Sequence, residues 1–361
     1  MSDDLPAAQG TFSSSAQAFW QGFTRPHAGT ALGALLLTLA AWIFVAVSST
    51  EARVRATDTA RWLPNPQDDW CHLNVVSIQG AERHADGPGQ TVVFVGASML
   101  RAILPSDESL SSTFAPAHTL VLAGSAMNYE DEAAVVDKFG GNFAGWFVLC
   151  VNRHTMARDL RARDVAKKQR GLTVEFSSAI LTEERRRAGL PVRSELGIPL
   201  LDHPRIYLPT LGGWTHLMRR PRQEGALPLA RSRPITGKEI YAMLPAPIAA
   251  AQARNFELLG RIAARLQANG RARLAIVECP FADEALPELH TVAWQAERAE
   301  FVRRREAWAQ AQGVPWLDVT EELKLRVEDF EDPMHIDSSA VRVRFANAVA
   351  RRLAELNKIN R

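Results

Sequence analysis

The chain has few cysteines and no marked excess of either charge. Only three of its 361 residues are cysteines, Cys71, Cys150 and Cys279, which are too few and too scattered for a disulfide framework or a zinc cluster. Because Cys150 and Cys279 lie within or beside apolar runs, we predict that both are buried small hydrophobic residues rather than reactive thiols. The formal net charge of +2 indicates no class of partner by itself. We expect no metal and no cofactor.

One stretch lacks charge altogether. Residues 28–50 contain no Asp, Glu, Lys or Arg, and most of them are large apolar residues or alanine. Because about 20 apolar residues suffice to cross a bilayer, we predict one transmembrane helix at 28–50. A buried core helix is an alternative, and so is a signal peptide cleaved near Ala46-Val47-Ser48. The length of the apolar run and of the segment before it favours an uncleaved anchor.

The remainder divides into three parts. We predict a tail at 1–27, a linker at 51–90 and a globular domain at 91–361, and the ordinary composition of 47% hydrophobic and 23% charged residues allows a sizeable core. The predicted strands are 91–95, 119–123, 146–151, 272–278 and 315–319, and the predicted helices are 129–139, 248–268, 291–312 and 338–356. Continuous apolar runs that alternate with helices are typical of parallel strands covered on both faces. They predict an α/β fold with a doubly wound, parallel five-stranded sheet in three flavodoxin-like layers.

A long insertion at 153–247 separates the third and fourth predicted strands. It is dense in basic residues: Arg153, Arg158, Arg161, Arg163, Lys167, Lys168, Arg170, Arg185, Arg186, Arg187, Arg219, Arg220 and Arg222. The insertion could be a solvated, partly helical surface, or a face that meets anionic lipid headgroups or a polyanionic polymer. We expect no nucleic acid as partner, because no nucleic-acid-binding motif is present.

Two short segments carry the residue types of a catalytic serine site. Ser98 follows Gly96 at the end of the first predicted strand, where a glycine permits a sharp turn, and a helix is predicted to start near Met99. Asp332 and His335 lie in the segment that is predicted to open the last helix. A serine hydroxyl needs a base to accept its proton, and a carboxylate can hold that base in the required tautomer. We therefore predict Ser98 as nucleophile, His335 as general base and Asp332 as its orienting carboxylate.

Each of these residues also has an ordinary structural explanation. A serine at a helix start is commonly a cap, Asp332 could cap the last helix, and His335 could lie on the surface. The catalytic interpretation is favoured by order along the chain. Ser98 ends the first strand, and the Asp/His pair lies between the last strand and the last helix, while sites in such folds form at the carboxyl ends of strands.

In these segments the chain resembles the SGNH-hydrolase (GDSL) superfamily. The family's nucleophile lies in a Gly-Asp-Ser block after the first strand, and the residues here are Gly96-Ala97-Ser98. Its second block supplies a glycine after the second strand, which matches Gly124. Its third block, Gly-x-Asn-Asp, corresponds to Cys150-Val151-Asn152-Arg153, where only the asparagine matches. The last block, Asp-x-x-His, is met by Asp332 and His335.

The resemblance covers about residues 91–355 apart from the insertion, and it implies an activity. The oxyanion hole would consist of the backbone N–H groups of Ser98 and Gly124 together with the side chain of Asn152. The reaction would be acyl transfer through an acyl-enzyme on Ser98, to a hydroxyl group or to water. Asn152 could instead cap a turn at the strand end, and Gly124 could be a turn glycine.

An anchor followed by such a domain resembles membrane-anchored proteins that work beside membrane-bound O-acyltransferases. Examples are the D-alanyl transfer protein of teichoic acid synthesis and the alginate O-acetylation proteins. This implies a serine acyltransferase or esterase that acts on a cell-envelope polysaccharide or polymer, with the membrane and a membrane-bound O-acyltransferase as partners. The alternative is a non-catalytic accessory that keeps the fold and docks the same membrane partner.

The charges beside the span and the implied function disagree on orientation. Arg25 precedes the span, whereas Arg53, Arg55 and Arg61 follow it, which by the positive-inside rule places the large domain in the cytoplasm. The implied envelope substrate favours a single-pass protein of the inner membrane with an extracytoplasmic, periplasmic domain. We favour the second orientation, because large translocated domains can override the local charge count. A cytoplasm-facing esterase remains the alternative.

Overall fold

The computed structural model describes residues 26–56, 90–124, 127, 129–141, 143–156, 178–187, 189, 192, 196, 236–238 and 249–359. The predicted tail at 1–27 and linker at 51–90 lie outside this set except at their edges. Most of the basic insertion at 153–247 lies outside it as well. The described residues include a five-stranded sheet and the helices that cover it.

The sheet is entirely parallel, as the sequence predicted. Its strands are β1 (Thr91–Ala97), β2 (His118–Gly124), β3 (Gly145–Val151), β4 (Ala272–Glu278) and β5 (Trp316–Leu317). They lie in the order β2-β1-β3-β4-β5, so the chain starts near one edge, reverses direction after β2 and then proceeds to the other edge. This order is consistent with a flavodoxin-like fold, in which ligand sites form where the strand order reverses.

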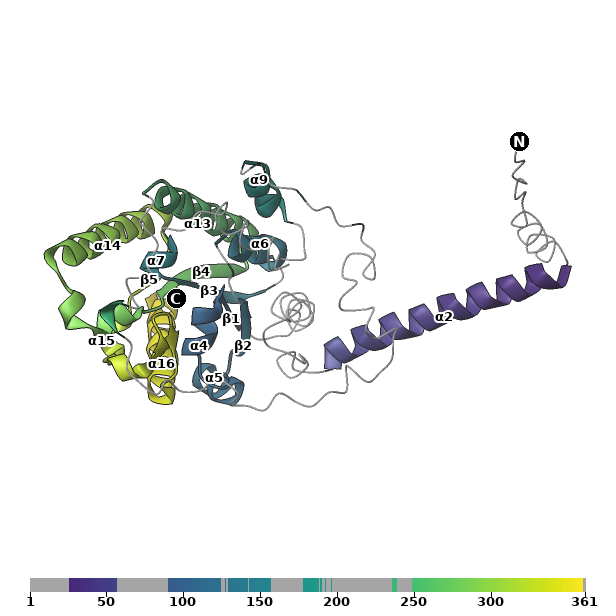
Figure 1. Cartoon of the computed structure of the whole chain (residues 1–361), viewed down its shortest axis with the longest axis horizontal. Helices are drawn as coiled ribbons and strands as arrows, with labels where there is room; N and C mark the ends of the chain where they lie inside the picture. The colour runs from purple at the N-terminus through teal and green to yellow at the C-terminus, as the bar shows by residue number, and fades with distance from the viewer. Residues whose placement is uncertain are drawn as a thin grey trace, which may run out of the picture.

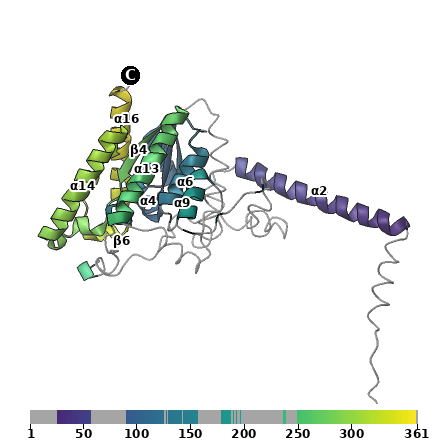
Figure 2. The ribbon, with the colours of Figure 1, turned by 90° about the horizontal axis from the view of Figure 1, so that it is seen from above.

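Helices cover both faces of the sheet, which makes three layers (Figure 1). They are α4 (Ser98–Ile103), α5 (Asp107–Phe114), α6 (Tyr129–Phe139), α13 (Ala249–Asn269), α14 (Val292–Gln312) and α16 (Ser339–Ile359). Side chains of α6, α13 and α14 share one core with the sheet, and those of α4, α5 and α16 share the other. Turning the view shows α13 and α6 lying over the strands (Figure 2).

Alternation along each strand explains how one segment supplies both cores. In β1 the buried Val93 and Val95 face the α6 and α13 side, while Val92 and Phe94 face the α4 and α16 side. Successive side chains of a strand point to opposite faces, so a strand covered on both faces must be apolar throughout. This is why the strands appear in the sequence as unbroken apolar runs.

The last helix is amphipathic and closes one layer. Its residues Val341, Phe345, Val349 and Leu353 are all buried, which is the apolar stripe expected at a spacing of four. Near its end, the carbonyl oxygen of the Asn357 side chain accepts hydrogen bonds from Trp146 and Arg273 of neighbouring strands. These contacts lie at the amino ends of β3 and β4, so the helix is held against the sheet along its length.

The first described helix, α2 (Pro26–Ala56), coincides with the predicted span. Three of its large apolar side chains, those of Leu35, Leu37 and Phe44, are 65, 73 and 72% exposed. Judged on the described residues alone, none of the helices combines the length and the apolarity of a membrane span. The side chains at positions 28, 46, 49 and 50 of the predicted span are not among those described.

Candidate active site

Ser98 lies at the junction of β1 and α4, at the carboxyl end of the sheet. It is the first residue of α4, one position earlier than the sequence predicted. Its neighbours Met99 and Leu100 are buried in the core below, which fixes the direction of the helix. As a first-turn residue, Ser98 has a backbone N–H without an acceptor inside the helix.

Gly96 serves close packing rather than a special backbone angle. A Cβ built at Gly96 would lie 3.0 Å from the Cβ atoms of both Cys150 and Leu100. That separation is tighter than most Cβ contacts, so a larger residue would require β3 or α4 to give way by a few tenths of an ångström. The glycine therefore lets the strand that carries Ser98 approach its neighbours closely.

Asp332 and His335 lie on a β-hairpin, and the prediction that they open the last helix is wrong. The hairpin pairs β6 (Phe330–Asp332) with β7 (His335–Ile336) in antiparallel fashion, and α16 begins only after it. Asp and Pro in the first two positions of the Asp332-Pro333-Met334-His335 turn suit a β-turn. The Asp332 carboxylate stabilises it by accepting hydrogen bonds from the N–H groups of Met334 and His335 at 2.8 and 2.9 Å.

The structure brings Ser98, His335 and Asp332 into one hydrogen-bonded chain. The Nε2 atom of His335 lies 2.9 Å from the Oγ of Ser98, and its Nδ1 lies 2.7 Å from the Oδ2 of Asp332. The side chains of His335 and Asp332 are 24 and 30% exposed, so the pair is partly shielded and still reachable from solvent. This is the geometry that a nucleophile, a general base and an orienting carboxylate require.

The protonation state of Asp332 determines which nitrogen of His335 can act as a base. Burial raises the pKa of this carboxyl, but the hydrogen bond and charge of His335 and the two backbone N–H donors outweigh burial and lower it below 3.8. Near neutral pH the carboxylate can therefore only accept a hydrogen bond, so Nδ1 must carry the ring proton. The Nε2 lone pair is then directed at the hydroxyl of Ser98.

Replacing Asp332 by asparagine should lower ester turnover on the order of 10⁴-fold. The amide can donate a hydrogen bond to His335, which favours the tautomer with the proton on Nε2 and so removes the base. The measurement is steady-state hydrolysis of an activated acetate ester by the full-length protein. Asp337→Asn is the matched control, because Asp337 pairs with Arg342 at 3.5 Å, and its turnover should stay close to wild type. Equal rates for both variants would contradict this role of Asp332.

The two remaining predicted oxyanion residues follow the strands on either side of β1. Gly124 ends β2 and pairs in register with Ala97, the residue before Ser98. Asn152 follows β3 directly and is 2% exposed. Because β2 and β3 both flank β1, their carboxyl ends lie beside the end that carries Ser98.

The contacts of Asn152 fix the orientation of its amide. Its Oδ1 accepts a hydrogen bond from the backbone N–H of His154 at 2.8 Å, and its Nδ2 donates to the carbonyl of Cys279 at 2.7 Å. Both partners are backbone groups of fixed polarity, so the amide cannot be rotated without losing both bonds. Asn152 thus caps the short helix α7 (Arg153–Met156), as the alternative interpretation allowed. The second N–H of Nδ2 is the one that an oxyanion would use.

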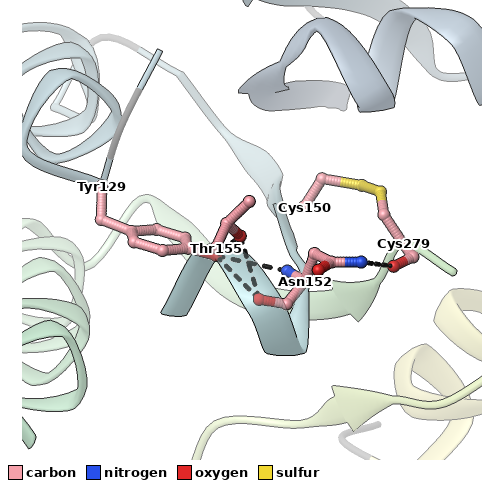
Figure 3. The surroundings of a disulfide bond; sticks show 5 residues. All are labelled: Tyr129, Cys150, Asn152, Thr155 and Cys279. Carbon is pink, nitrogen blue, oxygen red and sulfur yellow. Dashed lines mark hydrogen bonds between the residues drawn. A yellow bond between two sulfur atoms is a disulfide. The ribbon is translucent and has the colours of Figure 1, made fainter. Parts of the chain in front are cut away.

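Cys150 and Cys279 are buried, as predicted, but they are joined in a disulfide, which was not predicted from the sequence (Figure 3). Both are buried, at 3 and 2% exposed, and their Cα atoms are 6.0 Å apart. The bond joins the end of β3 to the residue after β4, on the core face that packs against α4 and α16. Sequence offered one signal, since each cysteine lies at the carboxyl end of a predicted strand, but without the strand order the two could not be paired.

In the sequence, Arg153 was grouped with the basic surface of the insertion. In the structure Arg153 is buried instead. Its guanidinium forms an ion pair with Asp283, and the two side chains are 4 and 1% exposed. His154 and Trp294 also hydrogen-bond with the Asp283 carboxylate, at 3.1 and 2.7 Å. Burial raises the pKa of Asp283, but these partners outweigh it and lower the pKa to about 2. No pattern in the sequence pointed to this cluster.

The segment after β4 holds both Asn152 and the turn that carries Asp332 and His335. Cys279 holds the Asn152 amide through its carbonyl, and three residues later the N–H of Ala282 donates to the carbonyl of Pro333 at 2.9 Å. Pro333 lies inside the turn that carries Asp332 and His335. The buried cluster around Asp283 follows immediately and anchors the same segment.

No protein-family model matches this chain, and no curated protein matches it either. The chemistry of the site must therefore be argued from its geometry.

Proposed function

We propose that this protein is a serine acyltransferase or esterase of SGNH type that acts on a cell-envelope polysaccharide or polymer. The observation that carries the proposal is the hydrogen-bonded chain from Ser98 Oγ through His335 to Asp332, at the carboxyl end of a parallel sheet. The carboxyl ends of the strands, next to the point where the strand order reverses, are where open α/β sheets form their sites.

In the first half-reaction Ser98 takes up the acyl group. His335 Nε2 accepts the hydroxyl proton as Ser98 Oγ attacks the acyl carbonyl carbon, and Asp332 stabilises the resulting imidazolium. The negative charge on the carbonyl oxygen would be held by the backbone N–H groups of Ser98 and Gly124 and by Asn152 Nδ2. As the tetrahedral intermediate collapses, the bond to the leaving group breaks and His335 returns its proton to that group.

In the second half-reaction the acyl group leaves Ser98. His335 removes a proton from a sugar or polyol hydroxyl, or from water, and that oxygen attacks the acyl-enzyme carbonyl. Collapse of the second intermediate breaks the bond to Ser98, and the serine oxygen regains its proton from His335. A polymer hydroxyl gives an acyltransferase and water gives an esterase, and both use the same residues.

The blocks of the SGNH family support the assignment at four positions. The order along the chain is that of the family. Ser98, Gly124 and Asn152 lie at the ends of β1, β2 and β3, and the hairpin with Asp332 and His335 comes after β5. The departures are Ala97 and Arg153, where the family has aspartate, and Cys150, where it has glycine. Because Arg153 is paired with the buried Asp283, its charge is balanced inside the fold and does not face the serine as a free cation.

The disulfide and the apolar helix α2 support an exported, membrane-anchored domain. Disulfides persist in oxidising compartments such as the periplasm and are rare in the cytoplasm. The exposed apolar side chains of α2 are the kind of surface that lipid covers. We therefore propose a single-pass anchor at 28–50 in the inner membrane, an extracytoplasmic domain, and a membrane-bound O-acyltransferase as partner.

A serine-reactive fluorophosphonate tests the proposed chemistry. Full-length protein in detergent should react with the probe, and mass spectrometry of the digest should find the adduct on the peptide that contains Ser98. Failure of the folded protein to react, with the probe active on a control serine hydrolase, would favour the non-catalytic accessory.

A reporter fusion after residue 361 tests the orientation. Alkaline phosphatase, which is active only after export, should give activity in such a fusion. Activity of a cytoplasmic reporter at the same position would instead support a cytoplasm-facing esterase.

A further inference from the structure

The disulfide lies beside the residue that is proposed to donate to the oxyanion. Cys150 precedes Asn152 by two positions, and Cys279 provides the carbonyl that accepts from Asn152 Nδ2 at 2.7 Å (Figure 3). The N–H of Cys279 also donates to the carbonyl of Val151 at 2.7 Å. The bond therefore joins the two strand ends between which the Asn152 side chain is held.

Among the described residues, the side-chain amide of Asn152 has no other hydrogen bond on the β4 side. Its oxygen is held by His154 within its own helix, and its backbone contacts the hydroxyl of Tyr129 at 3.2 Å. Neither of these contacts involves β4, since His154 belongs to α7 and Tyr129 to α6. In the part of the chain that the structure describes, the carbonyl of Cys279 is the group that ties the amide nitrogen to β4, so its position sets the direction of the remaining N–H.

The disulfide also lies next to the strand that carries Ser98 and to the segment that holds the hairpin of Asp332 and His335. The Cβ of Cys150 packs against Gly96, two residues before Ser98, so closely that a side chain there would require its neighbours to shift. On the other side, the segment from Cys279 continues to Ala282, which holds the turn of Asp332 and His335. The disulfide thus lies where the strand of the nucleophile, the oxyanion donor and the support of the hairpin meet.

We propose that Cys150 and Cys279 are positioning residues of the acyl-transfer reaction, whose bond fixes Asn152 Nδ2 at the oxyanion. This inference rests on the proposed function. A hydrogen-bond donor stabilises a developing charge only if it is already in place, because a donor that must reorient contributes far less. Loss of the bond leaves the end of β4 held to β3 by backbone hydrogen bonds alone, which allow small shifts of the Cys279 carbonyl, and the amide follows that carbonyl.

A double-mutant cycle on the full-length protein tests this coupling. Asn152→Ala should lower kcat by about 10²–10³-fold, as expected for one oxyanion donor. The variant Cys150→Ala/Cys279→Ala should lower kcat by roughly tenfold or more with KM unchanged, since the donor acts in the transition state. In the Asn152→Ala background, loss of the disulfide should lower kcat less than about twofold, because no donor remains to be misplaced.

Val148→Ala separates positioning from stability. Val148 is fully buried on β3, on the same face as Cys150, so its truncation destabilises the same strand. Its thermal unfolding midpoint should fall while its kcat stays within about twofold of wild type, measured well below the midpoint. The inference is wrong if Val148→Ala lowers kcat as much as disulfide loss does, or if disulfide loss has the same effect with and without Asn152.

Chemical reduction provides a second measurement should the double cysteine variant not fold. Wild-type protein is treated with a phosphine and alkylated, and mass spectrometry counts the two added groups on Cys150 and Cys279. Turnover should fall in step with the reduced fraction, and full turnover of folded, fully reduced protein would overturn the inference. Untreated wild-type protein that shows neither turnover nor labelling of Ser98 would instead contradict the proposed function itself.

Discussion

Replacing Ser98 by alanine is expected to lower ester turnover by about 10⁶-fold and to abolish fluorophosphonate labelling. The variant has no oxygen that can attack the acyl carbon, and His335 is left without the proton that it is placed to accept. The fold should be unchanged, because Ser98 makes its side-chain hydrogen bond to His335 and the neighbouring packing comes from Met99 and Leu100. Initial rates with an activated acetate ester and the yield of labelled protein measure the effect.

Ser111→Ala is the control for the loss of a serine hydroxyl as such. Ser111 is exposed on α5, and its hydroxyl hydrogen-bonds with Thr119 at 3.1 Å, at the amino end of β2 and away from the carboxyl ends that carry the candidate site. Its turnover and labelling should match wild type. Persistent labelling of Ser98→Ala at the wild-type rate would show that another residue is the nucleophile.

Replacing His335 by alanine should lower turnover nearly as much as loss of the serine does. Without the imidazole, no group takes the proton from Ser98 Oγ, and a serine hydroxyl is a weak nucleophile at neutral pH. Because the two residues act as a unit, Ser98→Ala/His335→Ala should be no slower than either single variant, within about threefold. The measurement is the rate of all three variants with the same ester.

His118→Ala is the matched histidine control. His118 is exposed at the amino end of β2, whereas the candidate site lies at the carboxyl ends of the strands, so its loss should leave the rate unchanged. A loss for the double variant equal to the product of the two single losses would contradict the shared mechanism. It would indicate that Ser98 and His335 contribute separately.

The parts of the fold that depend on local pattern were predictable. Strands covered on both faces must be apolar at every position, so β3 and β4 were recognised to within one residue at each end. The spacing of apolar residues in α16 marked its buried stripe for a similar reason. Ser98, Gly124 and Asn152 could be placed near one another because each directly follows, or ends, a predicted parallel strand.

The parts that depend on long-range geometry were not predictable. β5 is an edge strand, separated from β1 by β3 and β4, so the chain must cross back over the sheet before His335 can reach Ser98. No local pattern in the sequence indicates where the segment between β5 and α16 lies relative to Ser98, or that this segment contains a hairpin. The pairing of Cys150 with Cys279 needs the strand order in the same way, since it depends on β3 and β4 being neighbours.

The burial of Arg153 was not predictable for a different reason. A count of basic residues grouped it with the insertion, because ten of the residues between 153 and 187 are Arg or Lys. Its position directly after a buried strand sends its side chain inward, and a single acidic partner, Asp283, lies 130 residues further along the chain. Charge patterns along the sequence cannot reveal partners that only the folded sheet brings together.

The bond between Cys150 and Cys279 also alters the covalent connectivity of the molecule. It closes a ring between residues 129 positions apart, and the whole stretch 157–248 belongs to that ring. A peptide bond hydrolysed anywhere in this stretch leaves two polypeptides, one with Ser98 and the other with Asp332 and His335. They stay joined through sulfur, so a nicked molecule keeps all three residues of the candidate site in one covalent unit.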